Sequence, residues 1–280
     1  MKEKWDIEIL SKNSLFDLKL KEVIKYWDLC ILFVRRDFVA QFKQTILGPI
    51  WFVIQPILQA VTMYLVFHLM GGMSTDDLPP MLFYLSGNIL WLYFSDCLNA
   101  NANTFINNAN LFGKVYFPRL IVPISVVISN FLKFGIRLLL FISVFIYYMV
   151  NGTDIYICPL IWVVVPLVIL MAGYGLSLGV LFSSLTTKYR DLKFLLGFGV
   201  QLLMYGSSVV LPLSMVPEKY QFYLKLNPFV NIIEAFKYIT MGKGQFSSVW
   251  LLYSFGLLII ITFFALILFN KTEKNFIDTV

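Results

Sequence analysis

The sequence predicts an all-α integral membrane protein with six transmembrane helices, preceded by an amphipathic interfacial helix. Of its 280 residues, 59% are hydrophobic and 14% are charged, and the mean hydropathy is +0.78. A soluble chain of this length cannot bury that much apolar surface. Six apolar stretches also reach the roughly 20 residues that a helix needs to cross a bilayer. We divide the chain into an N-terminal segment (1–50), a six-helix domain (51–270) and a tail (271–280).

The N-terminal segment is basic and partly apolar, which is typical of a helix that lies along a membrane surface. We expect this helix over residues 14–34, with six membrane-facing side chains: Leu15, Phe16, Leu18, Val23, Ile24 and Trp27. Gly48 gives backbone freedom, and Pro49 suits the first turn of a new helix. The chain therefore changes direction at Gly48-Pro49, from the surface into the bilayer.

The six predicted spans cover about 51–70, 82–102, 121–150, 160–185, 194–213 and 248–269. The second span is polar for a membrane helix and carries Asp96. The third is long and contains Pro123, Lys133 and Arg137, so we expect it to begin with an interfacial turn. Gly175 and Gly179 in the fourth span form a Gly-x-x-x-Gly pattern, which indicates close helix packing.

The distribution of Lys and Arg predicts which side each loop faces. Sixteen of these residues lie in the N-terminal segment, in the loops after the second and fourth spans, and in the tail; four lie between the last two spans. Cytoplasmic loops carry the excess of positive charge, so both termini are expected in the cytoplasm. The excess of cations is spread along loops, which favours contact with anionic lipids over nucleic acid.

Residues 214–247 differ from the other connections. They contain Pro217 and Pro228 and an apolar-periodic stretch at 229–239. This pattern predicts short helices that dip into the outer interface without spanning it.

Catalytic motifs are missing from the sequence. The Gly-Lys pairs at Gly113 and Gly242 do not fit a nucleotide-binding Walker A loop. His68 is the only histidine, so we expect no metal site and no histidine-based catalysis. Cys30, Cys97 and Cys158 have unrelated spacings and are interpreted as small apolar residues.

Four segments resemble the membrane subunit of type-2 ABC exporters for O-antigen, capsule and teichoic-acid chains. They are Arg35–Pro56, Asn110–Arg119, Tyr189–Leu192, and Pro212–Glu218 with its continuation to Asn227-Pro228 and Ile233–Lys237. They occur in order between six spans, and the resemblance covers nearly the whole chain.

The resemblance implies two permease chains assembled with two ATPase chains in the bacterial inner (plasma) membrane, exporting a polyprenyl-diphosphate-linked glycan. ATP and Mg²⁺ would bind only the ATPase. Residues 106–119 would form a coupling helix, with Asn-rich caps at its start and Pro118 at its end. The implied ATPase-coupling residues are Asn110, Leu111, Lys114, Phe117, Pro118, Arg119, Tyr189, Arg190 and Asp191. The implied outer-gate residues are Pro217, Glu218, Asn227, Pro228 and Glu234.

A substrate path follows as a hypothesis from charges and rings inside the spans. Asp96, Lys133 and Arg137 are candidates for this path because ionisable groups inside a span are costly. Lys133 and Arg137 are four residues apart and share a helix face, so this pair could attract a pyrophosphate. The alternatives are that one of them pairs with Asp96 or that both reach toward the surface. Aromatic rings can stack on sugars, but they also gather at membrane interfaces. The aromatic candidates for the path are Trp51, Tyr64, Trp91, Tyr93 and Tyr205.

Two other functions stay open at this stage. Within transport, the alternative is an exporter of teichoic acid, a drug or a small lipid. From another class, the alternative is a membrane-embedded glycosyl or lipid transferase. The transferase is disfavoured because no large loop carries clustered acidic residues for a metal and a sugar nucleotide.

Overall fold

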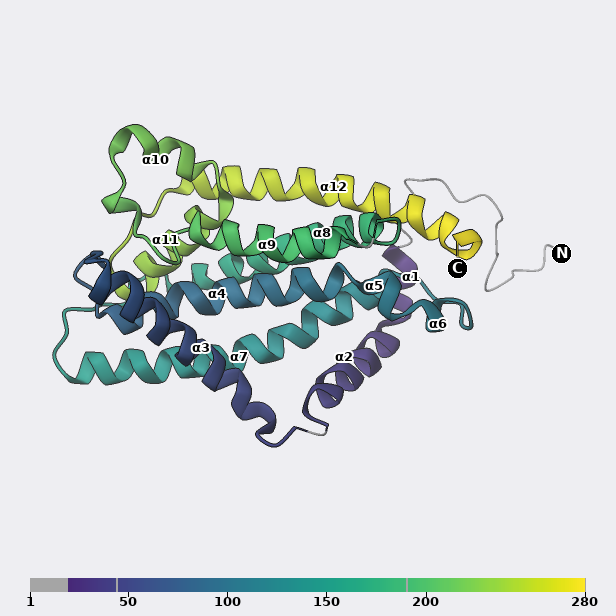
Figure 1. The fold of residues 1–280 in the computed structure, drawn as a ribbon, viewed down its shortest axis with the longest axis horizontal. Coiled ribbons are helices and arrows are strands. Elements are labelled where there is room, and N and C mark those ends of the chain that lie inside the picture. The colour runs from purple at the N-terminus through teal and green to yellow at the C-terminus, as the bar shows by residue number, and fades with distance from the viewer. Residues whose placement is uncertain (1–19, 44, 190, 280) are drawn as a thin grey trace.

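A computed structural model describes residues 20–43, 45–189 and 191–279, and these residues form helices and no strand. The long helices run side by side, with α10 and α11 at one end of the molecule and α1, α6 and the end of α12 at the other (Figure 1). The helices of the first half are α1 (Leu20–Lys25), α2 (Trp27–Phe42), η1 (Gly48–Ile50), α3 (Trp51–Met63), η2 (Tyr64–Met70), α4 (Pro80–Asn101), α5 (Thr104–Asn107), α6 (Ala109–Phe112) and α7 (Ile121–Val150). Those of the second half are η3 (Ile161–Val163), α8 (Val164–Thr186), α9 (Leu192–Tyr205), η4 (Leu213–Met215), α10 (Glu218–Lys225), α11 (Pro228–Met241) and α12 (Ser248–Thr279).

Within the described residues, four helical segments are long and apolar enough to cross a membrane: Gly48–Met70, Ile121–Val150, Ile161–Thr186 and Ser248–Glu273. They match the first, third, fourth and sixth predicted spans. The third begins directly as a helix at Ile121, and Pro123 fits there because backbone N–H groups in a first turn have no intrahelical partner. The sixth continues as a helix through Thr279, so residues 271–279 of the expected tail extend α12.

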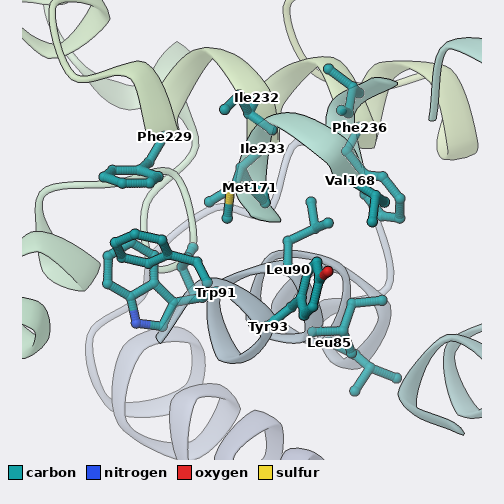
Figure 2. Packing of buried hydrophobic residues seen from close by; sticks show 14 of the residues in the cluster. Leu85, Leu90, Trp91, Tyr93, Val168, Met171, Phe229, Ile232, Ile233 and Phe236 are labelled. Atoms are coloured by element: carbon teal, nitrogen blue, oxygen red, sulfur yellow. The ribbon is translucent and has the colours of Figure 1, made fainter. Parts of the chain in front are cut away.

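The second predicted span, α4, is polar because its own chain encloses it. Sixteen of its 22 residues are buried, and it packs against α3, α7, α8 and α11. Two of its polar side chains donate to carbonyl groups inside the protein: Ser86 Oγ to that of Phe83 at 2.7 Å, and Asn88 Nδ2 to that of Pro56 at 3.4 Å. Around it, side chains from α4, α8 and α11 interdigitate (Figure 2). Because protein and not lipid surrounds most of α4, this helix does not need an apolar surface on every side.

The Gly-x-x-x-Gly pattern packs α8 onto α4. A Cβ at Gly175 would lie 2.5 Å from Cys97 Cβ, and one at Gly179 would lie 2.5 Å from Asn101 Cβ. Side chains at these two positions would therefore force the helices apart. The predicted close packing is confirmed, and it occurs within one chain.

The fifth predicted span, 194–213, is wrong at its C-terminal end. Helix α9 has only 14 residues and ends at Tyr205, which is about 21 Å of helix against a hydrocarbon core of about 30 Å. Beyond it, Asn227 Nδ2 donates to the carbonyl of Gly206, and Lys237 Nζ donates to that of Ser208. Side chains from distant segments therefore hold the backbone that sequence periodicity assigned to a helix.

The N-terminal segment is helical, with two corrections. The expected helix is divided at Tyr26 into α1 and α2, and α2 extends to Phe42. Val23 is buried, so it does not face the membrane as expected. It belongs to the same buried cluster as Phe33, whose ring centroid lies 5.7 Å from that of Phe117. Ile24 and Trp27 are exposed as expected; Leu15, Phe16 and Leu18 lie outside the described residues. Gly48 adopts a φ of +53°, so the predicted turn at Gly48-Pro49 is confirmed.

Candidate functional site

The intramembrane charges are partly paired. Arg137 Nη1 on α7 lies 2.8 Å from Asp96 Oδ2 on α4, with only 2% of the Arg137 side chain exposed. Of the alternatives considered for the two cations, pairing with Asp96 is therefore the one found for Arg137. Lys133, one turn earlier on α7, points its ammonium group toward the ring of Phe52 at 5.6 Å. Arg137 also lies over the Phe52 ring, at 6.0 Å, so the two cations share this ring, and only Arg137 has an ion pair among the residues that the structure describes.

A polar cleft opens between α2, α4 and α7, and we call it the α2–α4–α7 cleft. It encloses about 660 Å³. Ionisable and hydroxyl side chains that line it are Arg36, Asp37, Asp96, Thr104, Ser129 and Lys133. Carboxamides line it as well: Gln41, Asn99, Asn107, Asn108 and Asn130. Such a surface can bind an anion and several hydroxyl groups at once.

The aromatic candidates do not gather along one path. Trp91 and Tyr93 are buried in the core, where Trp91 packs against Phe229 with ring centroids 5.5 Å apart. Trp51 and Tyr205 are exposed on α3 and α9. Tyr64 stacks on His68, whose Nδ1 lies 2.9 Å from the carbonyl of Met73. The buried pair therefore serves packing within this chain.

The coupling candidates lie at the end of the molecule that holds α6 and the end of α12 (Figure 1). Arg119 is nearly buried; its Nη1 donates to the carbonyl of Glu273 at 2.8 Å and its Nε lies 3.8 Å from the Glu273 carboxylate. Burial lowers the pKa of Arg119, and Glu273 opposes that shift. Arg119 therefore fastens the segment after α6 to the last helix. Phe117 is buried, and the positions that remain accessible are Asn110, Lys114, Tyr189 and Asp191; Arg190 lies outside the described residues.

The coupling segment is not one helix. Helices α5 and α6 have four residues each, and α6 ends at Phe112, well before Pro118. The asparagine side chains do not cap them either: Asn103 and Asn108 donate to the carbonyls of Asn99 and Thr104, four residues earlier. Neither asparagine makes a side-chain cap hydrogen bond to the helix that follows it, so the expected caps are wrong.

The outer-gate candidates surround α11, which has 12 of its 14 residues buried. Glu234 holds two loops onto this helix: Oε1 accepts from the N–H of Leu213 at 3.4 Å, and Oε2 from that of Gln245 at 3.1 Å. Asn227 caps the helix by accepting from the N–H of Phe229 at 3.1 Å, with Pro228 in the first turn. Pro217 and Glu218 begin the exposed helix α10.

Lys237 was missed as a site residue. It is 1% exposed, donates to the carbonyl of Ser208, and lies 3.4 Å from the ring centre of Phe83. Its position three residues after Glu234 on one helix face is the signal that could have found it.

The apolar helices in the described part of the chain are those of a multi-pass membrane protein. The sequence profile described as "ABC-2 type transporter" matches residues 28–241, and the chain belongs to that family. It is 26% identical to the O-antigen export system permease protein RfbA of Klebsiella pneumoniae over 264 residues, covering 93% of this chain and 98% of that protein. It is also 26% identical over 225 residues to RfbA of Myxococcus xanthus (79% of this chain, 83% of that protein), and 24% identical over 248 residues to the polysialic acid transport protein KpsM of Escherichia coli (85% and 91%).

Proposed function

We propose that this chain is the permease subunit of an ATP-driven exporter that moves a lipid-linked polysaccharide from the cytoplasm across the inner membrane. The observation that carries the proposal is the end-to-end similarity to permeases named for O-antigen export. The polar cleft and the polar, enclosed α4 are compatible with a hydrophilic cargo. An exporter of teichoic acid, a drug or a small lipid remains the second candidate within the same family.

The proposed topology has six crossings: α3 with η2, α4, α7, η3 with α8, α9, and α12. Helix α9 is short, and residues 206–213 would complete its crossing as irregular backbone. Such backbone is tolerated at membrane depth where protein covers it, and Ser207, Ser208 and Leu213 are buried. In this topology both termini and α6 face the cytoplasm, and the excess of Lys and Arg on that side supports this orientation.

A separate ATPase chain, which binds ATP and Mg²⁺, would supply the energy for the proposed exporter. Accessible Asn110, Lys114, Tyr189 and Asp191 would contact it, and Arg119 would carry its motion to α12. A second permease copy would complete the conduit. Exposed apolar side chains on α9 supply a surface for that copy or for lipid: Phe194, Leu195, Phe198 and Leu202.

The test is reconstitution of the permease with the ATPase encoded beside it, in sealed vesicles loaded with a polyprenyl-diphosphate-linked glycan. We expect ATP-dependent transfer of the glycan across the bilayer, detected by its accessibility to a sugar-oxidising reagent. Transfer of a drug or short phospholipid under the same conditions, with no glycan transfer, would favour the second candidate. Glycosyl transfer by the permease alone would support the transferase and refute the proposal.

A further inference from the structure

We propose that the α2–α4–α7 cleft binds the sugar-phosphate head of the lipid-linked glycan, with the ammonium group of Lys133 on the phosphate. This inference rests on the proposed function and adds a position and a chemistry for the first contact with cargo. It also separates Lys133 from Arg137, whose guanidinium is committed to Asp96.

Two ion pairs form at the cleft, and Lys133 belongs to neither of them. Arg36 Nη2 lies 2.8 Å from Asp37 Oδ1, and Asp96 pairs with Arg137 at 2.8 Å. Lys133 is 8% exposed and forms no ion pair among the residues that the structure describes. The carboxylates of Asp96 and Asp37 act on this ammonium group only from beyond ion-pair distance. A nearly buried cation without a direct counterion is costly, so an anion that enters the cleft is attracted to this position.

Two buried hydroxyls line the same cleft as that cation. Ser129 is four residues before Lys133 on α7, so both side chains share a helix face. Within the described part of the chain, Ser129 Oγ and Thr104 Oγ1 have no hydrogen-bond partner, and both residues are at least 98% buried. Buried polar groups are nearly always hydrogen-bonded, so these two are suited to a ligand that offers acceptor oxygens.

The remaining lining suits a sugar. Gln41 on α2 and Asn107 on α5 are exposed carboxamides that line the cleft, and each can donate to and accept from a hydroxyl group. The volume of about 660 Å³ falls within the roughly 300–1,000 Å³ of small-ligand sites. Ile31 and Leu32 on α2 are exposed and apolar, so a lipid tail can stay in the bilayer while its head enters.

A phospholipid head offers the same phosphate, and the experiment separates the two sources. The permease–ATPase complex is titrated in detergent with a polyprenyl diphosphate carrying one N-acetylglucosamine, and bound lipid is identified by native mass spectrometry. Phosphatidylglycerol is the competitor. We expect Lys133→Gln to weaken probe binding about tenfold or more, the size of one charge-assisted hydrogen bond. Lys133→Arg keeps the charge and retains most of the binding.

The matched control is Lys271→Gln, which removes an exposed lysine on α12 outside the cleft and leaves binding unchanged. If Lys133→Gln does not assemble, the rim variants Gln41→Ala and Asn107→Ala carry the test, each with a few-fold loss for the sugar-bearing probe. Unchanged binding in Lys133→Gln, or in both rim variants, overturns the inference, as does equal displacement by phosphatidylglycerol. Lys133-dependent binding without ATP-driven transport would instead overturn the proposed function and leave the cleft assignment standing.

Discussion

The contact between α4 and α8 offers the sharpest test of the fold, through Gly179→Ala. The new Cβ would lie 2.5 Å from Asn101 Cβ and 3.0 Å from the carbonyl oxygen of Leu98. Neither atom is the end of a flexible side chain, so the helices must separate. Overpacking of this kind costs about 1–3 kcal/mol, whereas replacing Gly by Ala in a helix contributes at most about 1 kcal/mol. The net effect is a destabilisation of about 1–2 kcal/mol, or several degrees in the midpoint of thermal unfolding.

The assay uses Cys97, which is fully buried on α4 and faces Gly175. With Cys30 and Cys158 replaced by alanine, so that Cys97 is the one thiol left, a thiol-reactive dye reports its exposure as the purified protein is heated in detergent. Gly256→Ala in α12 is the matched control, because its Cβ would meet nothing within 4 Å. We expect Gly179→Ala to expose Cys97 at a lower temperature and Gly256→Ala to melt at or above the wild-type temperature. Equal melting of all three proteins would refute the packing argument.

Four further predictions concern charged side chains. Asp96→Asn leaves Arg137 buried without its counterion, which costs about 3 kcal/mol and lowers the yield of folded protein on size-exclusion chromatography; an additional Arg137→Gln restores the yield, and failure to restore it would argue against a pair. Glu234→Gln removes one of two acceptor oxygens, so we expect faster proteolysis of the 242–247 loop, while an unchanged cleavage rate would mean that the carboxylate does not hold that loop. A Lys114→Cys variant labelled by impermeant maleimide in inverted vesicles but not in intact cells would support the cytoplasmic placement, and the opposite pattern would reject it. Arg119→Gln should raise the hydrogen exchange of the last turns of α12 without altering the rest of the protein.

The sequence predicted the membrane crossings better than the site. Hydropathy located four helices to within a few residues, and Gly48-Pro49 marked a turn, because both signals are local. The same patterns failed after Tyr205, where the carbonyls of Gly206 and Ser208 bond to side chains that follow much later in the chain. Spacing also placed Lys133 and Arg137 together, since nothing along α7 reveals that Asp96 on another helix takes only one of them.

The enclosure of α4 has a consequence for biosynthesis. An aspartate at the centre of an isolated membrane helix opposes its insertion by about 2.5–3.5 kcal/mol, and the partner of Asp96 emerges 41 residues later. At 5–20 residues per second the ribosome needs about 2–8 s to deliver Arg137. The glycines of α8 that receive α4 arrive later still. If α4 crosses the membrane as proposed, the translocation machinery has to shelter it from lipid during that interval, and this helix then enters the bilayer together with α7 and α8.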